Sequence, residues 1–302
     1  MSLHVPVALR RAVLSLTLTE DGSIGDLQTR TDGVVHIDAA GAELLIRWPE
    51  LFLAAGYAGV DDDLPGDETT RRVGRWLRLR IALHELMSLP GTPEEARARV
   101  LAKVRLRALP VDHPVHPGPS WPRRTVLGGA LDVGLALRGV DDDGRSDYEA
   151  VGVLPAGVLI AAGVDVSEAA VRADRHLKDM AVLASERVRR DTTSVLRPLG
   201  DADVLTLLTS RELRTALVDG HGMRTAAVPV RNRGWLDLGR IDPAFAIAAA
   251  ELSEPDERGF DRPVLITKDE VALIRTGGDP VAQALADPSP EELGHPPRRR
   301  LA

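Results

Sequence analysis

The sequence of 302 residues contains no cysteine, and only three of its 38 lysine and arginine residues are lysines. Without cysteine the chain can form no disulfide, no thiolate nucleophile and no Cys-ligated zinc or iron–sulfur site. Aromatic residues make up 3% of the chain, so Leu, Val, Ile and Ala must fill most of the core. The preference for arginine is typical of a high-GC bacterial genome, and it reduces the functional weight of any one arginine cluster.

Long apolar runs are also lacking. The longest is Val151–Val164, which Pro155 and several glycines interrupt and which is too short to cross a bilayer. Ala12–Thr19 alternates with Ser and Thr, unlike the apolar core of a signal peptide. We therefore expect a soluble, cytoplasmic protein without membrane contact, and the composition leaves its oligomeric state open.

The charge that is present is distributed unevenly along the chain. Residues 71–124 hold twelve cations and four acidic side chains, a net charge of +8 in a chain of −7. The cations are Arg71, Arg72, Arg75, Arg78, Arg80, Arg97, Arg99, Lys103, Arg105, Arg107, Arg123 and Arg124. Such segregation steers association with partners of opposite charge, although it says little about the fold.

Patterning in the first half predicts a strand region followed by a helical hairpin. Val13–Thr19 and Val34–Asp38 alternate as strands do, whereas Thr70–Ser88 has apolar residues at helical spacing. Thr92, followed by Pro-Glu-Glu, combines an N-cap, a proline at the first helical position and a capping box. We expect this second helix to end near Leu109 and to pack antiparallel to the first.

Five prolines between residues 110 and 122 predict an extended connector between two domains. We expect an N-terminal domain over 1–110, a proline-rich linker over 111–124, an α+β domain over 125–286 and a disordered tail over 287–302.

The second domain is expected to mix antiparallel hairpins with helices. The expected strands are Ala130–Leu137, Tyr148–Leu154, Val204–Leu208, Thr225–Val230, Trp235–Leu238, Pro263–Thr267 and Val271–Arg275. The expected helices are Ser167–Arg190, Ser210–Val218 and Pro243–Leu252. This mixture favours an α+β fold over a doubly wound parallel sheet.

The predicted hairpin carries most of the basic block. Its candidate binding residues form one stripe on each helix, Arg71, Arg75 and Arg78 on the first and Arg99, Lys103 and Arg107 on the second. Two such stripes could bind an acidic protein surface or the phosphates of a nucleic acid. Alternatively, they are the solvated sides of amphipathic helices, some of them paired with acidic residues of the same protein. No recognised nucleic-acid motif accompanies them.

The acidic runs and the histidines give weaker patterns. Asp61–Asp63 and Asp141–Asp143 lack the remaining ligands of a calcium loop and are interpreted as solvated acidic turns. His113 and His116 could share an edge of a polyproline segment, but exposed linker histidines are the simpler interpretation. We expect no metal and no cofactor, since nucleophile-elbow, dinucleotide and phosphate-loop motifs are missing.

Three segments of the second half carry a family resemblance. They are Val158-Leu159-Ile160 leading into Ser167–Met180, Leu207-Leu208-Thr209-Ser210 before a short helix, and Ala227-Val228-Pro229-Val230-Arg231. In the order of these elements, about 120 residues resemble the YtpQ-like family of uncharacterised bacterial proteins. That family implies no chemistry that could be carried over to residues of this chain.

Three functional hypotheses follow from the sequence. The first is a non-enzymatic interaction protein, such as an adaptor, a chaperone-like factor or an assembly component, that docks an acidic partner on the basic helices. The second is a protein that contacts nucleic-acid phosphates through the same helices. The third is an enzyme with an unrecognised site in the second domain, around His221 and Arg224, where Arg231 and Arg233 could also flank an anion. Those arginines could equally be edge-strand charges that prevent sheet-to-sheet pairing.

Overall fold

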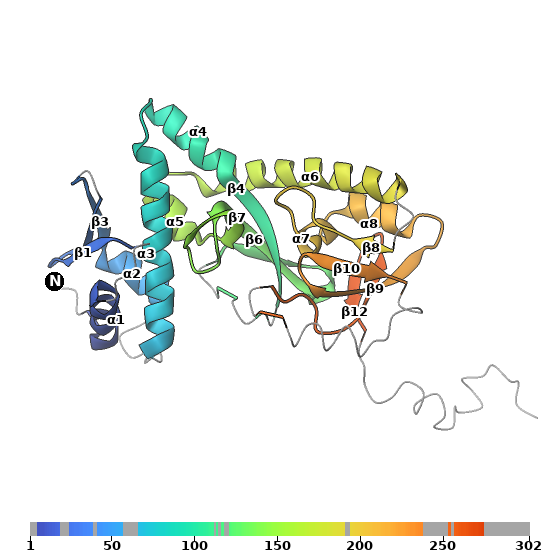
Figure 1. Cartoon of the computed structure of the whole chain (residues 1–302), viewed down its shortest axis with the longest axis horizontal. Helices are drawn as coiled ribbons and strands as arrows, with labels where there is room; N and C mark the ends of the chain where they lie inside the picture. Colours follow the sequence, from blue (N-terminus) through green and yellow to red (C-terminus); the bar gives the residue numbers. More distant parts are fainter. Residues whose placement is uncertain are drawn as a thin grey trace, which may run out of the picture.

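The computed structural model describes a mixed helix and sheet structure, drawn out along one axis (Figure 1). The described residues are 5–18, 24–38, 41–56, 66–111, 113, 116–117, 121–190, 194–237, 253–254 and 257–274. Their α-helices are α1 (Val7–Leu18), α2 (Trp48–Ala55), α3 (Gly66–Ser88), α4 (Pro93–Lys103), α5 (Ala156–Ala161), α6 (Val166–Arg190), α7 (Val204–Leu208) and α8 (Arg211–Val218). The sheets between them are antiparallel, which confirms the α+β class.

The first sheet is a meander at one end of the molecule. Its strands are β1 (Asp26–Thr29), β2 (Gly33–Ile37) and β3 (Glu43–Arg47), in that order. The expected strand at Val13–Thr19 is wrong, because α1 covers Val13–Leu18, the part of this segment that the structure describes. Its buried residues Leu9, Val13 and Leu16 recur at helical spacing and pack in one core with Trp76 of α3. The interleaved Ser and Thr residues imitated a strand pattern.

The helical hairpin is present, but its second helix is shorter than expected. Thr92 caps α4, its hydroxyl accepting a hydrogen bond from the Glu95 backbone N–H at 3.2 Å. The helix ends at Lys103, and β4 (Val104–Pro110) continues directly from it. The extension of this helix to Leu109 is therefore wrong: β4 pairs with a neighbouring strand along its whole length.

The central sheet is built around one long strand. The strands are β4, β5 (Arg123–Val126), β6 (Leu131–Val140) and β7 (Ser146–Val153), with a 3-10 turn, η2 (Leu127–Gly129), before β6. β6 pairs with β4 on one side and with β5 and β7 on the other. Strands on both sides of the predicted linker thus share a sheet, and Trp121 in that linker is buried. One core cluster extends from Val5 to Ala173, so the core does not divide at the linker.

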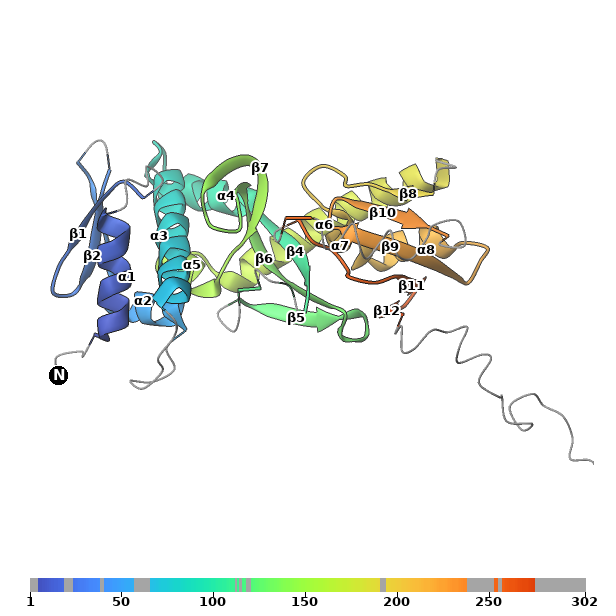
Figure 2. The same cartoon turned by 60° about the horizontal axis from the view of Figure 1, so that its bottom comes forward.

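The two faces of the central sheet differ in chemistry. β6 alternates, so that Val133 and Leu135 lie on the face toward α6, which runs behind β4 and β6 (Figure 2). Gly134 lies on the other face, where an added Cβ would lie 2.4 Å from Trp121. Arg107 of β4 is paired with Gly134 in the register and shares this second, polar face.

The last sheet lies at the far end of α6. Its order is β12 (Val271–Leu273), β11 (Val264–Thr267), β9 (Met223–Val230), β10 (Arg233–Leu236) and β8 (Val195–Leu196). Among the described residues, the hairpins and the helix at Ser210–Val218 are confirmed, whereas Val204–Leu208 is α7 and not a strand. Asp203 caps α7 by accepting a hydrogen bond from the Thr206 backbone N–H at 2.7 Å. The expected helix Pro243–Leu252 and the tail over 287–302 lie outside the described residues. None of the described helices is long and apolar enough to span a bilayer.

Candidate functional site

A cleft of about 650 Å³ opens between the middle of α6, strand β7 and the loop before α7. We call it the α6–β7 cleft. Its lining residues are Arg138, Tyr148, Glu149, Val151, His176, Met180, Pro198, Gly200, Asp201, Ala202, Asp203, Arg231 and Asn232. These residues come from β6, β7, α6, the 198–203 loop and the turn between β9 and β10, so the cleft forms only once the chain has folded.

Asp201 is the most strongly held polar residue of the cleft. Its Oδ1 lies 2.6 Å from His176 Nε2, and its Oδ2 accepts a hydrogen bond from Arg105 Nε at 2.6 Å. Burial alone would raise the pKa of the Asp201 carboxyl, but the hydrogen bonds from His176 and Arg105 outweigh it. The pKa is held well below its usual range, so Asp201 is ionised at neutral pH.

The loop before α7 presents Asp201 by means of a tight turn. Leu199 and Ala202 exchange backbone hydrogen bonds of 3.0 and 3.1 Å, which leaves Gly200 and Asp201 at the tip. Gly200 has a φ of +58°, a left-handed value that glycine adopts without steric cost. The same loop ends at Asp203, whose pKa is raised by burial although Arg107 opposes the shift.

The His176–Asp201 pair can take part in proton transfer. A carboxylate accepts hydrogen bonds, so the ionised Asp201 fixes a proton on His176 Nε2. The other ring nitrogen, Nδ1, has no hydrogen bond to another described residue. In the neutral ring this nitrogen is an acceptor, which is the arrangement of a general base oriented by a carboxylate.

Arg138 and Tyr148 form an open wall of the cleft. The Arg138 guanidinium carbon lies 5.6 Å from the centre of the Tyr148 ring, within range of a cation–π contact. Arg138 Nη1 lies 3.8 Å from Asp201 Oδ2. Since Asp201 is already hydrogen bonded to two other residues, Arg138 keeps donors for a ligand in the cleft.

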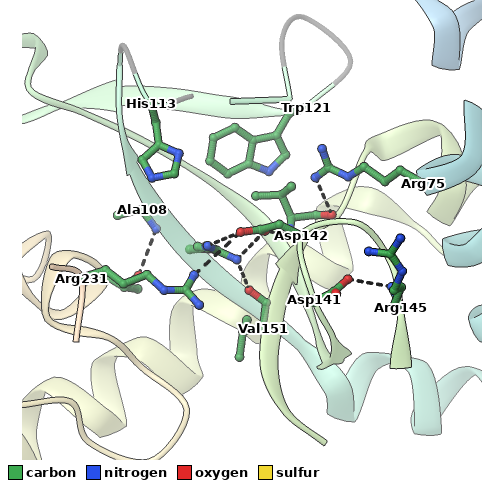
Figure 3. Close-up of polar contacts among 12 residues, drawn as sticks. Arg75, Ala108, His113, Trp121, Asp141, Asp142, Arg145, Val151 and Arg231 are labelled. Carbon is green, nitrogen blue, oxygen red and sulfur yellow. Dashed lines mark hydrogen bonds and ion pairs between the residues drawn. The ribbon is translucent and has the colours of Figure 1, made fainter. Parts of the chain in front are cut away.

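Arg231 forms the deeper wall and belongs to a buried cluster around Asp142 (Figure 3). Arg107 binds Asp142 through two hydrogen bonds of 2.5 Å, with exposed fractions of 2% for Arg107 and 8% for Asp142. Arg231 Nη1 lies 3.9 Å from Asp142 Oδ2, and its buried Nε has no hydrogen-bond partner. Asp142 is therefore shared between two guanidinium groups, and Arg231 is only weakly neutralised.

Arg75 and Arg78 of α3 fasten the β6–β7 hairpin to that helix. Arg75 Nη2 donates to the Val153 carbonyl at 3.3 Å, and Arg78 Nη1 donates to the Asp143 carbonyl at 2.7 Å. Burial lowers the pKa of Arg75 to about 10, with Asp142 opposing the shift, so the group stays charged at neutral pH. Both arginines bind the protein's own hairpin, and neither is free for a partner.

The six predicted binding residues do not form one exposed surface. Arg75, Arg78 and Arg107 are buried, and Arg107 lies on β4 and not on a helix. Arg71 pairs with Glu68, and Arg99 donates to carbonyls at the end of α3. Lys103 is partly buried and has no ion pair to another described residue. The alternative interpretation, solvated helix sides with some acidic pairing, is met only in part. Arg71 and Arg107 pair with acidic residues, but Arg107 is buried, as are Arg75 and Arg78.

The predicted histidine and acidic sites also differ from expectation. His113 is buried, with Nε2 lying 3.1 Å from the Arg258 carbonyl oxygen, and His116 Nε2 lies 3.0 Å from Asp132 Oδ2. The interpretation as exposed linker histidines is therefore wrong. Asp142 is buried and ion paired, so its turn is not simply solvated. Asp61–Asp63 lie outside the described residues.

The third predicted site, at His221 and Arg224, is not assembled. Arg224 donates to both oxygens of Asp237, and Arg233 is the first residue of β10, which lies between β9 and β8 and is not an edge strand. Arg231 lines the α6–β7 cleft, whose lining does not include His221, Arg224 or Arg233. His176 and Asp201 were missed because they lie 25 residues apart and carry no motif. The described residues contain no group of three His, Asp or Glu side chains suited to a metal ion.

Comparison with known proteins adds no identity to this geometry. No family model, no curated protein and no solved structure matches the chain. The resemblance of the second half to the YtpQ-like family stays a prediction.

Proposed function

We propose that the protein binds a small anionic ligand, carrying a carboxylate or phosphate group, in the α6–β7 cleft. The observation that carries the proposal is the state of Arg231. Its only acidic neighbour at ion-pair distance among the described residues is Asp142, at 3.9 Å, and Arg107 occupies both oxygens of that carboxylate. A guanidinium in the wall of the cleft that has only a distant ion pair, and whose Nε has no hydrogen-bond partner, favours a ligand that brings its own negative charge.

Other residues of the cleft complement such a ligand. Arg138 offers a second guanidinium at the open side, 40% exposed, beside the Tyr148 ring. His176 supplies a ring nitrogen that can accept a proton from a bound acid. Asp201 is ion paired with Arg105 and hydrogen bonded to His176, so it repels an anion less than an unpaired carboxylate would.

A ligand that binds the folded protein raises its melting temperature, and this gives a direct test. The probes are inorganic pyrophosphate and citrate, compared with chloride at equal ionic strength because multivalent anions also stabilise proteins generally. We expect a concentration-dependent rise for at least one probe, and at least a tenfold loss of its apparent affinity in Arg231→Gln and in Arg138→Gln.

The control is Arg190→Gln, at the exposed end of α6 and outside the cleft. It should respond to the probes as the parent protein does. Because Arg231→Gln can change the melting temperature by itself, the rise caused by the ligand is compared and not the absolute value. Equal rises in all four proteins, or no rise with either probe, would refute the proposal.

The earlier predictions of an acidic protein partner and of nucleic-acid phosphates stay predictions. The six predicted binding residues support them less than expected, because Arg75, Arg78 and Arg107 are buried in contacts within the protein. Binding of an acidic partner needs cations that are exposed next to one another. Such cations lie on another part of the molecule, outside the predicted stripes.

A further inference from the structure

A second concave surface lies along the first half of α6. It is a groove of about 680 Å³ between α6 and strands β5 and β6, which we call the α6–β5 groove. Its residues are Leu106, Pro122, Arg123, Arg124, Val133, Gly134, Leu135, Val166, Ala170, Val171, Asp174, Arg175 and Lys178. It is separate from the α6–β7 cleft, with which it shares no lining residue.

The floor of the groove is apolar. Leu106, Val166 and Ala170 are only partly buried, and Val171 is 62% exposed on the first half of α6. An exposed valine beside three partly buried apolar residues offers a partner surface that water hydrates poorly. The floor alone does not define what binds there, because any apolar segment could cover it.

The charged residues at the rim of the groove favour one class of partner over others. Arg124 Nη2 and Lys178 Nζ lie 3.7 and 2.9 Å from the two oxygens of the same carboxylate, Asp174. Arg175 is exposed and has no ion pair or hydrogen bond to another described residue. Arg123 pairs with Asp132 outside the groove. The rim thus carries three further cations and one acid beside an apolar floor, in a chain whose net charge is −7.

We infer that the α6–β5 groove docks an acidic, amphipathic segment of a protein partner. Apolar side chains of that segment would cover Val171 and its neighbours, while its carboxylates would pair with Arg124, Arg175 and Lys178. Charges at an interface rim mainly raise the rate of association and select the partner, so binding should weaken as salt increases. This inference does not depend on the ligand proposed for the α6–β7 cleft.

The test is fluorescence anisotropy with a labelled 15-residue peptide of alternating glutamate and leucine clusters. A peptide with lysine in place of each glutamate is the charge control. We expect the acidic peptide to bind more tightly than its lysine counterpart. Its affinity should fall at least tenfold in the double variant Arg175→Glu/Lys178→Glu and in Val171→Asp.

Matched variants on the same helix separate the groove from α6 in general. Arg190→Glu and Val182→Asp also change exposed residues, and Val182 lies eleven residues beyond Val171, roughly 16 Å along the helix. Both should bind the acidic peptide like the parent protein. Circular dichroism of each variant verifies that its fold is kept.

Several outcomes would overturn the inference. The acidic peptide fails to bind, the lysine peptide binds equally well, or the groove variants bind like the matched controls. If a labelled 15-nucleotide dT strand binds more tightly than the acidic peptide, and Arg175→Glu/Lys178→Glu abolishes that binding, the groove would be assigned to nucleic acid instead. A dimer in light scattering that dissociates in Val171→Asp would assign it to a second copy of this chain.

Discussion

Two carboxylates, Asp142 and Asp201, are each bound by an arginine of strand β4, yet their surroundings differ. Arg105 and Arg107 are two residues apart and lie on the same face of β4, so the strand itself spaces the two ion pairs. Arg107 and Asp142 of the β6–β7 turn are buried, whereas Asp201, the partner of Arg105, lines the α6–β7 cleft. Asp201 also binds His176, a side chain that can exchange a proton.

The comparison teaches that an arginine–carboxylate pair takes its role from what else surrounds it. The inner pair has no titratable histidine, and its neighbours Arg75 and Arg231 add only positive charge. It fixes the hairpin that forms one wall of the cleft. The outer pair fixes a loop and orients His176. We therefore expect the inner pair to dominate stability and the outer pair to influence the cleft.

The largest effect is expected when the inner pair is broken. In Arg107→Met, Asp142 keeps the backbone N–H of Val153 at 3.3 Å but loses its bidentate partner. Breaking a buried ion pair on one side leaves an uncompensated charge and costs about 3–5 kcal/mol. Urea unfolding should show a lower midpoint with a similar slope. A loss below about 1 kcal/mol would mean that Arg231 replaces Arg107.

A smaller loss is expected for the outer pair. In Asp201→Asn the side chain keeps one acceptor but faces Arg105 and His176 without negative charge. Loss of charge-assisted hydrogen bonds at a partly solvated site costs about 1–3 kcal/mol. The same urea experiment measures it. The comparison fails if Asp201→Asn destabilises the protein as much as Arg107→Met does.

The sequence predicts the local features correctly, but not the ion-pair partners that lie far apart along the chain. Thr92 with its capping box and the apolar stripe of α6 are short-range patterns, and both elements are present. Arg107 was placed on a helix because the alternation of β4 follows α4 without a break. Its partner Asp142 is 35 residues away, and the partner of Arg105 is 96 residues away. No local spacing encodes such pairs, since tertiary packing creates them.

Lowering the pH should reduce the difference in unfolding free energy between the parent protein and Asp201→Asn. The pKa of Asp201 is lowered in the folded state, so its contribution is fully present above the unfolded value of about 4. That contribution is lost as the pH falls below this value toward the folded pKa. Unfolding free energies measured between pH 6 and pH 2.5 should converge below pH 4. A constant difference across this range would show that ionisation of Asp201 does not stabilise the fold.

The smallest effect is expected where the same chemistry is fully solvated. Arg190 and Glu186 form an i,i+4 pair of 3.3 Å at the end of α6, with 81% of the Arg190 side chain exposed. Water and salt screen such pairs, and holding two long side chains in place costs entropy, so the net contribution is about 0.3–0.5 kcal/mol. Arg190→Gln should therefore leave the urea midpoint almost unchanged, and 0.5 M sodium chloride should remove any remaining difference. A loss comparable to that of Asp201→Asn would show that burial does not rank the three arginine–carboxylate pairs, because the most exposed pair would then stabilise the fold as strongly as the pair at the cleft.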